Sequence, residues 1–219
     1  MATEATDEQV IAALSPLLLD ERRARIDQVA SCRLSGIAVV LENLSDPHNG
    51  AAVLRSAETQ GVLEVWTTGS KLRFSERVTQ GADKWLTILH DDLITTCVED
   101  LKARGFSLCA AVPGAASSLD DLDPKMPTAF FFGNEHEGLS AAARRLVDVE
   151  FSIPMVGFSE SLNLSVACAI TLYTHARRRR QALGCTGDLD ATALLHLRAR
   201  YYRKDVRGAE AVIARYLKS

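Results

Sequence analysis

The stretch Ile37–Gly61, IAVVLENLSDPHNGAAVLRSAETQG, joins an apolar run to a helical pattern through a polar loop. Its β-branched start predicts a strand over Ile37–Glu42. Asn49 opens a predicted helix that runs to Gln60, and Gly61 is a typical C-cap signal. A buried strand that leads directly into a helix indicates an α/β protein.

The same alternation continues along the chain. Further strands are predicted at Val62–Thr68, Trp85–His90, Phe106–Val112, Thr128–Gly133 and Val149–Met155. Further helices are predicted at Asp91–Gly105, Leu139–Val147 and Ser161–Ala182. Short apolar strands separated by helices favour a mainly parallel sheet with helices on both faces.

The two ends of the chain differ from this body. Residues 1–35 form a predicted N-terminal helical extension, which Pro16 divides into two short helices. Residues 36–182 form the α/β domain. Residues 183–219 begin with a linker, Leu183–Asp188, and continue as one or two basic helices.

Composition limits the classes of protein to consider. A chain of 219 residues with 47% hydrophobic and 24% charged residues fits one α/β domain with terminal additions. No apolar span is long enough for a membrane helix, and the N-terminus lacks the basic start of a secretory signal. Five cysteines without C-x-x-C spacing fit reduced thiols and no metal site. We therefore expect a cytoplasmic protein without a membrane partner.

Charge is unevenly distributed. From Thr171 to the end, eleven Lys or Arg residues face four Asp or Glu residues, a net +7 within a chain of net charge −3. A basic tail on an acidic body favours a polyanionic partner such as RNA. Solvated helix faces explain the same composition equally well.

Because ligands in open α/β sheets bind beyond the carboxyl ends of strands, polar loops after strands are candidate sites. In DPHNGAAVLR, Asn49 suits a helix N-cap or a ligand contact. Arg55 opposes the helix dipole and needs an anion, either Glu58 on the surface or an RNA phosphate.

Two later loops have the same character. In FFFGNEHEGLS, Gly133 and Gly138 bracket a turn in which Glu135 binds a ligand or simply completes the turn. In IPMVGFSESLNLSVACAI, Ser161 and Asn163 stand at the start of a helix, and one of them suits an N-cap. The loop histidines, His48 and His136, are interpreted as exposed.

Several common active-site motifs are missing. No G-x-G-x-x-G follows the first strand, and no G-x-x-x-x-G-K-[ST] occurs, so dinucleotide and ATP fingerprints are absent. The sequence also has no H-E-x-x-H motif and no G-x-S-x-G nucleophile elbow. These absences argue against the corresponding dehydrogenases, kinases, metalloproteases and hydrolases.

Taken together and in order, the three loops resemble the motifs of the SPOUT class of RNA methyltransferases, in its TrmH-type branch of ribose 2'-O-methyltransferases. The matching text is ENLSDPHNGAAVLRSAETQG, FFFGNEHEGLS and IPMVGFSESLNLSVACAI, and the resemblance covers about Val39 to Arg180. The resemblance implies a SPOUT fold with a C-terminal trefoil knot. It also implies S-adenosylmethionine as the methyl donor and a homodimer.

The resemblance implies roles for individual residues. The residues expected at the catalytic centre are Arg55, Asn49, Glu135, Ser161 and Asn163. Those expected to bind S-adenosylmethionine are Ala110, Gly133, Ile153, Met155 and Leu162. The basic residues expected to bind RNA are Arg22, Arg25, Arg177, Arg178, Arg200, Arg203 and Lys204. No metal is expected.

The leading interpretation is a tRNA guanosine 2'-O-methyltransferase acting at position 18 of the D-loop. Alternatives are methylation of ribosomal RNA or of another tRNA position, and a non-catalytic RNA-binding knot protein. Within the leading interpretation, Arg55 acts either as a phosphate clamp or as the base that the family proposals favour. The first is preferred because a guanidinium is almost never deprotonated.

Overall fold

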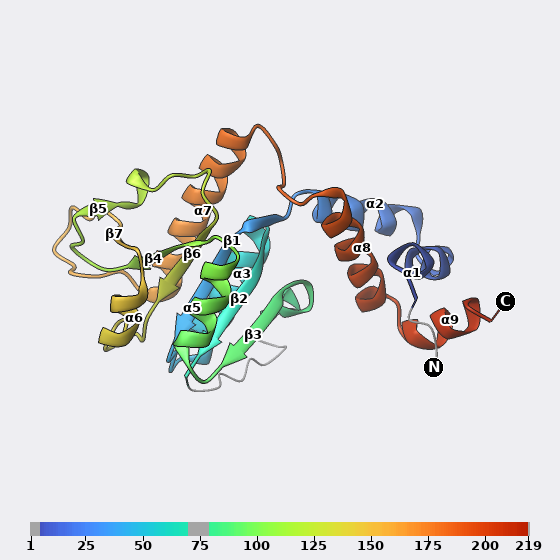
Figure 1. The fold of residues 1–219 in the computed structure, drawn as a ribbon, viewed down its shortest axis with the longest axis horizontal. Helices are drawn as coiled ribbons and strands as arrows, with labels where there is room; N and C mark the ends of the chain where they lie inside the picture. Colours follow the sequence, from blue (N-terminus) through green and yellow to red (C-terminus); the bar gives the residue numbers. More distant parts are fainter. Residues whose placement is uncertain (1–4, 70–78, 219) are drawn as a thin grey trace. The chain divides into compact units, whose positions relative to one another are not determined.

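The computed structural model describes residues 5–69 and 79–218 (Figure 1). The chain divides into two compact units. One is Leu34–Cys185, called here the sheet unit, and the other combines Met1–Arg33 with Thr186–Ser219 and is called the helical unit. The two ends of the chain, which the sequence analysis treats as separate extensions, therefore belong to the same unit.

The sheet unit contains a seven-stranded sheet in the order β3-β2-β1-β6-β4-β7-β5, and its neighbouring strands run parallel. The strands are β1 (Leu34–Glu42), β2 (Val62–Thr68), β3 (Thr87–Asp91), β4 (Ser107–Ala111), β5 (Ser117–Ser118), β6 (Thr128–Phe132) and β7 (Val149–Ser152). The predicted parallel α/β architecture is confirmed. The trefoil knot stays a prediction.

Helices cover both faces of this sheet (Figure 1). They include α3 (Pro47–Gln60), α5 (Ile94–Ala103), α6 (Ala141–Leu146) and α7 (Leu164–Leu183). Side chains of α3 and α7 share one buried cluster with Val39 and Leu41 of β1. The alternate β1 residues Ala38 and Val40 belong to a second cluster with α5. Successive apolar side chains of β1 thus point to opposite faces of the sheet and pack against helices on each face.

Some predicted boundaries are wrong. Asp91 ends β3 instead of starting the next helix, and its Oδ1 accepts the Leu93 N–H at 2.8 Å. Trp85 lies in a 3₁₀ turn, Ala82–Trp85, so the strand begins only at Thr87. Local hydrogen bonds of this kind compete with regular structure and are not visible in apolar periodicity.

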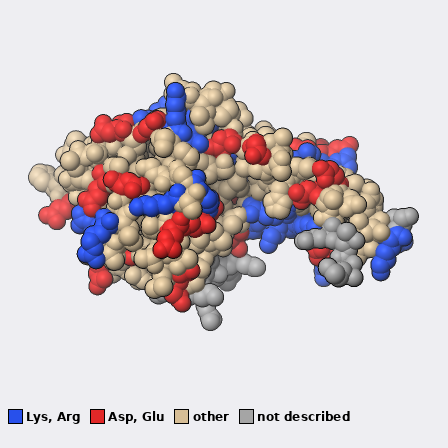
Figure 2. All heavy atoms as spheres, in the orientation of Figure 1, with Lys and Arg blue, Asp and Glu red and all other residues tan. Residues whose placement is uncertain are grey.

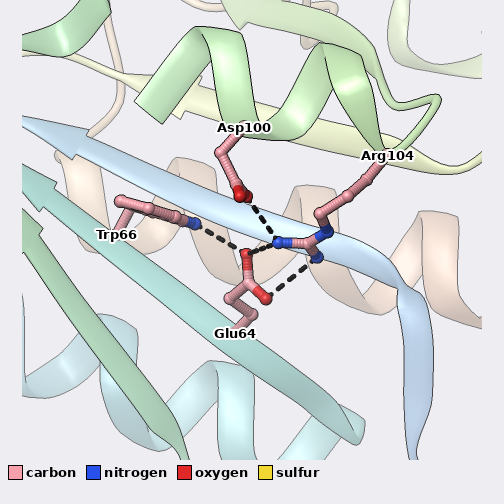
Figure 3. A network of polar contacts seen from close by, with 4 residues as sticks. All are labelled: Glu64, Trp66, Asp100 and Arg104. Carbon is pink, nitrogen blue, oxygen red and sulfur yellow. Dashed lines mark hydrogen bonds and ion pairs between the residues drawn. The ribbon is translucent and has the colours of Figure 1, made fainter. Parts of the chain in front are cut away.

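A polar network fixes α5 to β2 (Figure 3). Arg104, which follows α5, donates from Nη1 and Nη2 to the two carboxylate oxygens of Glu64 at 2.9 and 3.0 Å. It also donates to Asp100 at 2.8 Å, and the Trp66 indole N–H donates to Glu64 at 2.6 Å. This bidentate pair fastens the end of the helix to the start of the strand.

The helical unit is built from α1 (Asp7–Leu14), α2 (Asp20–Ser31), α8 (Ala191–Asp205) and α9 (Ala209–Tyr216). Pro16 lies in a 3₁₀ turn between α1 and α2, which confirms the predicted break. The C-terminal segment, predicted as one or two basic helices, forms the two helices α8 and α9. Bidentate ion pairs join Arg22 to Asp205 and Arg198 to Asp27 across these helices.

Three further findings limit the chemistry. Cys97, Cys109 and Cys168 are buried free thiols, and burial raises the pKa of each. Across residues 5–69 and 79–218, no group of three or more His, Cys, Asp or Glu side chains is arranged to hold a metal ion. In the same residues, no helix combines the length and apolarity needed to span a membrane.

Candidate functional site

A cavity of about 460 Å³ lies where the loops after β4, β6 and β7 meet. Its lining includes four of the residues expected at a cofactor, which are Gly133, Ile153, Met155 and Leu162. Glu135, Ser161 and Asn163 also line it. The cavity therefore brings together residues from two of the three loops that the sequence singles out.

Glu135 connects this cavity to the first loop. One carboxylate oxygen accepts hydrogen bonds from the Ser45 hydroxyl at 2.8 Å and the Ser45 N–H at 3.3 Å. The other accepts from the Asn49 side-chain amide at 3.0 Å and the Asp46 N–H at 3.3 Å. Four donors thus surround a single carboxylate.

These donors set the protonation state of Glu135. Partial burial raises the pKa of the carboxyl group, but the hydrogen bonds from Asn49 and Ser45 outweigh it and lower the pKa to about 2. The group is therefore ionised at neutral pH and accepts hydrogen bonds without donating any. Its role is to hold the first loop against the cavity.

Asn49 extends the chain of contacts to the third loop. Its Oδ1 accepts a hydrogen bond from the Asn163 side-chain amide at 3.1 Å. Asn163 in turn caps α7, because its Oδ1 accepts the Ser165 N–H at 2.9 Å and the Val166 N–H at 3.3 Å. The three loops are thus joined through Glu135, Asn49 and Asn163.

The expectation that Asn49 opens the helix is wrong. The N-cap of α3 is Asp46, whose side chain accepts the His48 N–H at 2.8 Å, and Pro47 occupies the first helical position. Proline suits that position because it needs no N–H partner there. Asn49 therefore lies within the first turn, and its buried side chain is used for Glu135 and Asn163 instead of for capping.

The loop between Gly133 and Gly138 is closed by its own backbone. Asn134 and Gly138 exchange two N–H···O bonds of 2.9 Å, and the Asn134 side-chain amide donates to the Asn43 carbonyl at 2.7 Å. A Cβ atom on Gly133 would lie 2.1 Å from the Gly138 carbonyl carbon, and Gly138 has a φ of +69°. Both glycines are therefore required by the turn.

Arg55 is placed differently from the other expected catalytic residues. It is exposed on α3 and does not line the cavity, and its side chain makes no hydrogen bond or ion pair with any described residue. The surface pair with Glu58 that the sequence allows is thus not formed. The guanidinium is free to bind an external anion.

Ala110 does not fit its expected place. It is fully buried within the sheet, in the cluster that packs on α5, and the cavity lining begins one residue later. Ala111, Val112 and Pro113 line the cavity in its place. The sequence predicted contacts around Ala110, at the end of this strand, but it did not name these three residues. Ala111 ends β4, and Val112 and Pro113 follow it.

Several of the expected RNA-binding residues already have partners within the protein. Arg22 pairs with Asp205, and Arg203 with Glu210 at 2.5 Å. Arg25 donates to the Gln28 side chain at 3.0 Å. Each of these three guanidinium groups therefore has a partner within the protein in the absence of RNA.

Of the remaining residues expected to bind RNA, two have contacts within the protein and two have none among the described residues. Arg178 donates to the Leu119 and Leu122 carbonyls at 3.0 and 3.1 Å, and Arg200 lies over the Tyr201 ring at 5.6 Å. Arg177 and Lys204 are exposed and make no hydrogen bond or ion pair with the described residues. These two side chains are available to an external polyanion.

The helical unit is not strongly basic as a whole. Its sequence holds eleven Lys or Arg residues and ten Asp or Glu residues, because the acidic N-terminal segment offsets the basic C-terminal one. Figure 2 likewise shows acidic and basic side chains interspersed on the face in view. Contact with a polyanion therefore depends on the individual unpaired cations and not on the unit's net charge.

Comparison with known proteins identifies the family. The model of the SpoU rRNA Methylase family matches residues 36–173. A tRNA (guanosine(18)-2'-O)-methyltransferase from Borreliella burgdorferi is 31% identical over 205 residues, covering 92% of this chain and 94% of that protein.

Solved structures agree. The A. aeolicus TrmH/SpoU tRNA modifying enzyme has a TM-score of 0.77 at 30% identity, covering 86% of this chain and 98% of that one. The SpoU methyltransferase AviRb from Streptomyces viridochromogenes, solved in complex with the cofactor AdoMet, has a TM-score of 0.61 at 28% identity, covering 66% and 60%. The match spans the sheet and all three joined loops, and the chain belongs to the SpoU rRNA methylase family.

Proposed function

We propose that this protein transfers a methyl group from S-adenosylmethionine to the ribose 2'-hydroxyl of guanosine 18 in tRNA. The observation that carries the proposal is the hydrogen-bonded junction of three loops beside the cavity, with an unpaired arginine on the adjoining helix. The names of the relatives supply the substrate and the position. The AdoMet complex of AviRb supports the donor.

The cavity fits such a donor in size and lining. Its volume of about 460 Å³ lies within the range of small-molecule sites. Apolar side chains such as Ile153, Leu162 and Leu164 line it together with Gly133. When bound there, S-adenosylmethionine supplies a methyl group activated by a sulfonium charge.

The chain's own residues then position the acceptor. Arg55 binds an RNA phosphate through its planar guanidinium and so fixes the ribose. Glu135, Asn49 and Asn163 hold the three loops in register, and Ser161 supplies a hydroxyl at the cavity wall. Alignment of the two reactants is the main contribution required, because the donor is already activated.

The direct test is methyl transfer to a defined RNA. Purified protein, labelled S-adenosylmethionine and an unmodified tRNA transcript should give labelled tRNA, and primer extension should stop at position 18. A transcript with adenosine at position 18 is the matched control and should stay unlabelled. Label in ribosomal RNA alone, or at another tRNA position, would contradict the proposal.

We propose a homodimer formed through an apolar face on α7 and the loop before it. Val166, Ile170 and Tyr173 follow one side of α7 and are 46%, 37% and 58% exposed. Val156 and Phe158, on the loop after β7, are fully exposed. Apolar groups of this number on one helix and its adjoining loop favour burial against a second copy.

Light scattering tests this assembly. Wild-type protein should have twice the mass of one chain, and Tyr173→Lys should shift it toward one chain. Leu93→Lys, at an exposed leucine just before α5 and outside this face, should leave the mass unchanged. A single-chain mass for wild type at micromolar concentration would contradict the dimer.

We further propose that unpaired cations of the helical unit and of α7, including Lys204 and Arg177, bind the tRNA backbone. Phosphate contacts fix the position of an RNA without reading its sequence. Because tRNA is the proposed substrate, we propose a cytoplasmic location.

A further inference from the structure

One wall of the cavity is a single turn, because every residue from Gly133 to Leu139 lines it. The start of this turn is fastened to the loop after β1 through hydrogen bonds of Asn134 and Glu135. A turn held at one end only can shift within the cavity. Its other end, where Leu139 meets Ser140, therefore needs a fastening of its own.

Glu42, the last residue of β1, holds that end of the turn. Its Oε2 accepts the Ser140 N–H at 2.8 Å, and its Oε1 accepts the Ser140 hydroxyl at 2.7 Å. The Ser140 hydroxyl oxygen in turn accepts the Ala143 N–H at 3.0 Å and so caps α6. One carboxylate thus fixes both the backbone and the side chain of the residue that joins the turn to the helix.

Burial makes this contact hard to exchange for another. Glu42 is only 5% exposed, and among the described residues Ser140 is the sole donor to its carboxylate. Because a buried carboxylate without hydrogen-bond partners is costly, Ser140 cannot move away without a large loss of free energy. Neither residue lines the cavity, so Glu42 acts on a bound molecule only through the turn.

We propose that Glu42 is a positioning residue for the binding of S-adenosylmethionine, an inference that rests on the proposed function. Through Ser140, the Glu42 carboxylate holds Gly138 and Leu139 in place as part of the wall against which the donor binds. Arg55 has no part in this chain of contacts. Loss of Glu42 should therefore weaken donor binding much more than it weakens tRNA binding or slows the chemical step.

Calorimetric titration of the purified protein with S-adenosylmethionine tests this role without RNA. Glu42→Ala should weaken donor binding by about 10-fold, the effect of losing hydrogen bonds to one charged group. The KM for the donor should rise by a similar factor. The methyl-transfer rate at saturating donor and the affinity for tRNA should change little.

Glu64→Ala is the matched control for a general loss of stability. Glu64 also accepts two hydrogen bonds from one partner, Arg104, and fastens a helix to the sheet (Figure 3). It lies near the start of β2, whereas the cavity lies beyond the ends of its strands. Glu64→Ala should therefore lower stability and keep the wild-type affinity for the donor. Equal losses of donor affinity in the two variants would overturn the inference.

Ser140→Ala completes a double-mutant cycle. If Glu42 acts through Ser140, the loss of donor affinity caused by Ser140→Ala should be smaller in the Glu42→Ala background. Hydrogen exchange in the donor-free protein gives a second readout. The amides of Gly138 and Ser140 should exchange faster in Glu42→Ala than in wild type, and at the wild-type rate in Glu64→Ala.

The outcomes separate this inference from the proposed function. Wild-type donor affinity in Glu42→Ala, or strictly additive losses in the cycle, would refute the positioning role while methylation of tRNA stands. If Glu42→Ala does not fold, Ser140→Ala alone decides, and unchanged donor affinity in that variant would refute the role. If wild type binds no S-adenosylmethionine, the proposed function fails and this inference fails with it.

Discussion

Asn49 and Asn163, 114 residues apart in the chain, share a hydrogen bond of 3.1 Å that runs from the Asn163 side-chain amide to the side-chain Oδ1 of Asn49. The Asn49 amide group points the other way and donates to Glu135 at 3.0 Å. Asn49 therefore acts as donor to one loop and acceptor from the other. Aspartate, which is isosteric but cannot donate when ionised, cannot reproduce this arrangement.

Asn49→Asp tests the junction directly. The new carboxylate would face the Glu135 carboxylate, so the free energy of unfolding should fall by about 1–3 kcal/mol and methyl transfer should fall with it. Chemical denaturation would measure the loss of stability. NMR titration of Glu135 would measure its pKa, which should rise. Ser45→Ala removes one donor to Glu135 while leaving Asn49 in place, and should give a smaller change in each. Equal effects would show that Asn49 has no special role.

Glu135 also predicts how stability depends on pH in strong acid. Its pKa is about 2 in the folded protein, below the ordinary carboxyl value of 4.5. The unfolded chain therefore binds the proton first, and the contribution of Glu135 to stability is lost as the pH falls from about 4.5 to 2. Glu135→Gln should lower stability at pH 7 and flatten the profile in this window. Parallel profiles for the two proteins would contradict the prediction.

His175 predicts a second window at higher pH. It is fully buried on α7, packs edge-on against Phe130 at 4.9 Å, and finds no hydrogen-bond partner for either ring nitrogen among residues 5–69 and 79–218. Burial, reinforced by Arg178 and Arg179, lowers its pKa from 6.5 to about 4. The unfolded chain takes up a proton that the folded chain resists, so stability should fall as the pH drops from 6.5 to 4.

The variant His175→Leu isolates this effect. The loss in wild type over that window should be on the order of 3 kcal/mol, and His175→Leu should remove it. Urea denaturation at half-unit pH steps would measure the difference, with His48→Asn as the exposed-histidine control. A wild-type profile that stays flat between pH 6.5 and 4 would show that His175 titrates normally.

The local sequence pattern predicts the strands of the sheet. It does not predict the hydrogen bonds that join the three loops through Glu135, Asn49 and Asn163. Apolar β-branched runs such as Val39–Leu41 predict buried strands, and Gly61 ends its helix with a φ of +85° as expected. The role of Asn49 could not be read locally, because its partners lie 86 and 114 residues away. Asp46 lies four residues after the strand and directly before Pro47, which is a stronger N-cap pattern than Asn49 offers. The sequence-based prediction did not use it.

The basic tail shows a similar limit. Its positive charge was counted correctly, but the partners of individual cations depend on folding. Arg198 meets Asp27 across 171 residues, and Arg178 binds carbonyl groups of the segment around Leu119. Neither interaction could be predicted from charge alone, and both reduce the number of cations that are free for RNA.

Arg55→Lys separates the clamp from a general positive charge. Lysine keeps the charge but lacks the planar fork that binds phosphate in a bidentate manner. The rate of methyl transfer should fall by roughly 10- to 100-fold, the value of one charge-assisted hydrogen-bond pair. Affinity for S-adenosylmethionine, measured by calorimetry, should be unchanged because Arg55 lies outside the cavity lining. Near wild-type turnover would exclude the clamp.

The dependence of tRNA binding on salt should report the unpaired cations. A substitution that removes one cation from a phosphate should reduce the slope of log affinity against log salt by about 0.7–0.9. Lys204→Gln and Arg177→Gln should each reduce it by about that amount, because both side chains are exposed and have no described partner. Arg203→Gln should reduce it less, since Glu210 already pairs with Arg203. Filter binding between 50 and 300 mM salt would measure all three, and a wild-type slope near zero would mean that phosphate contacts do not hold the tRNA.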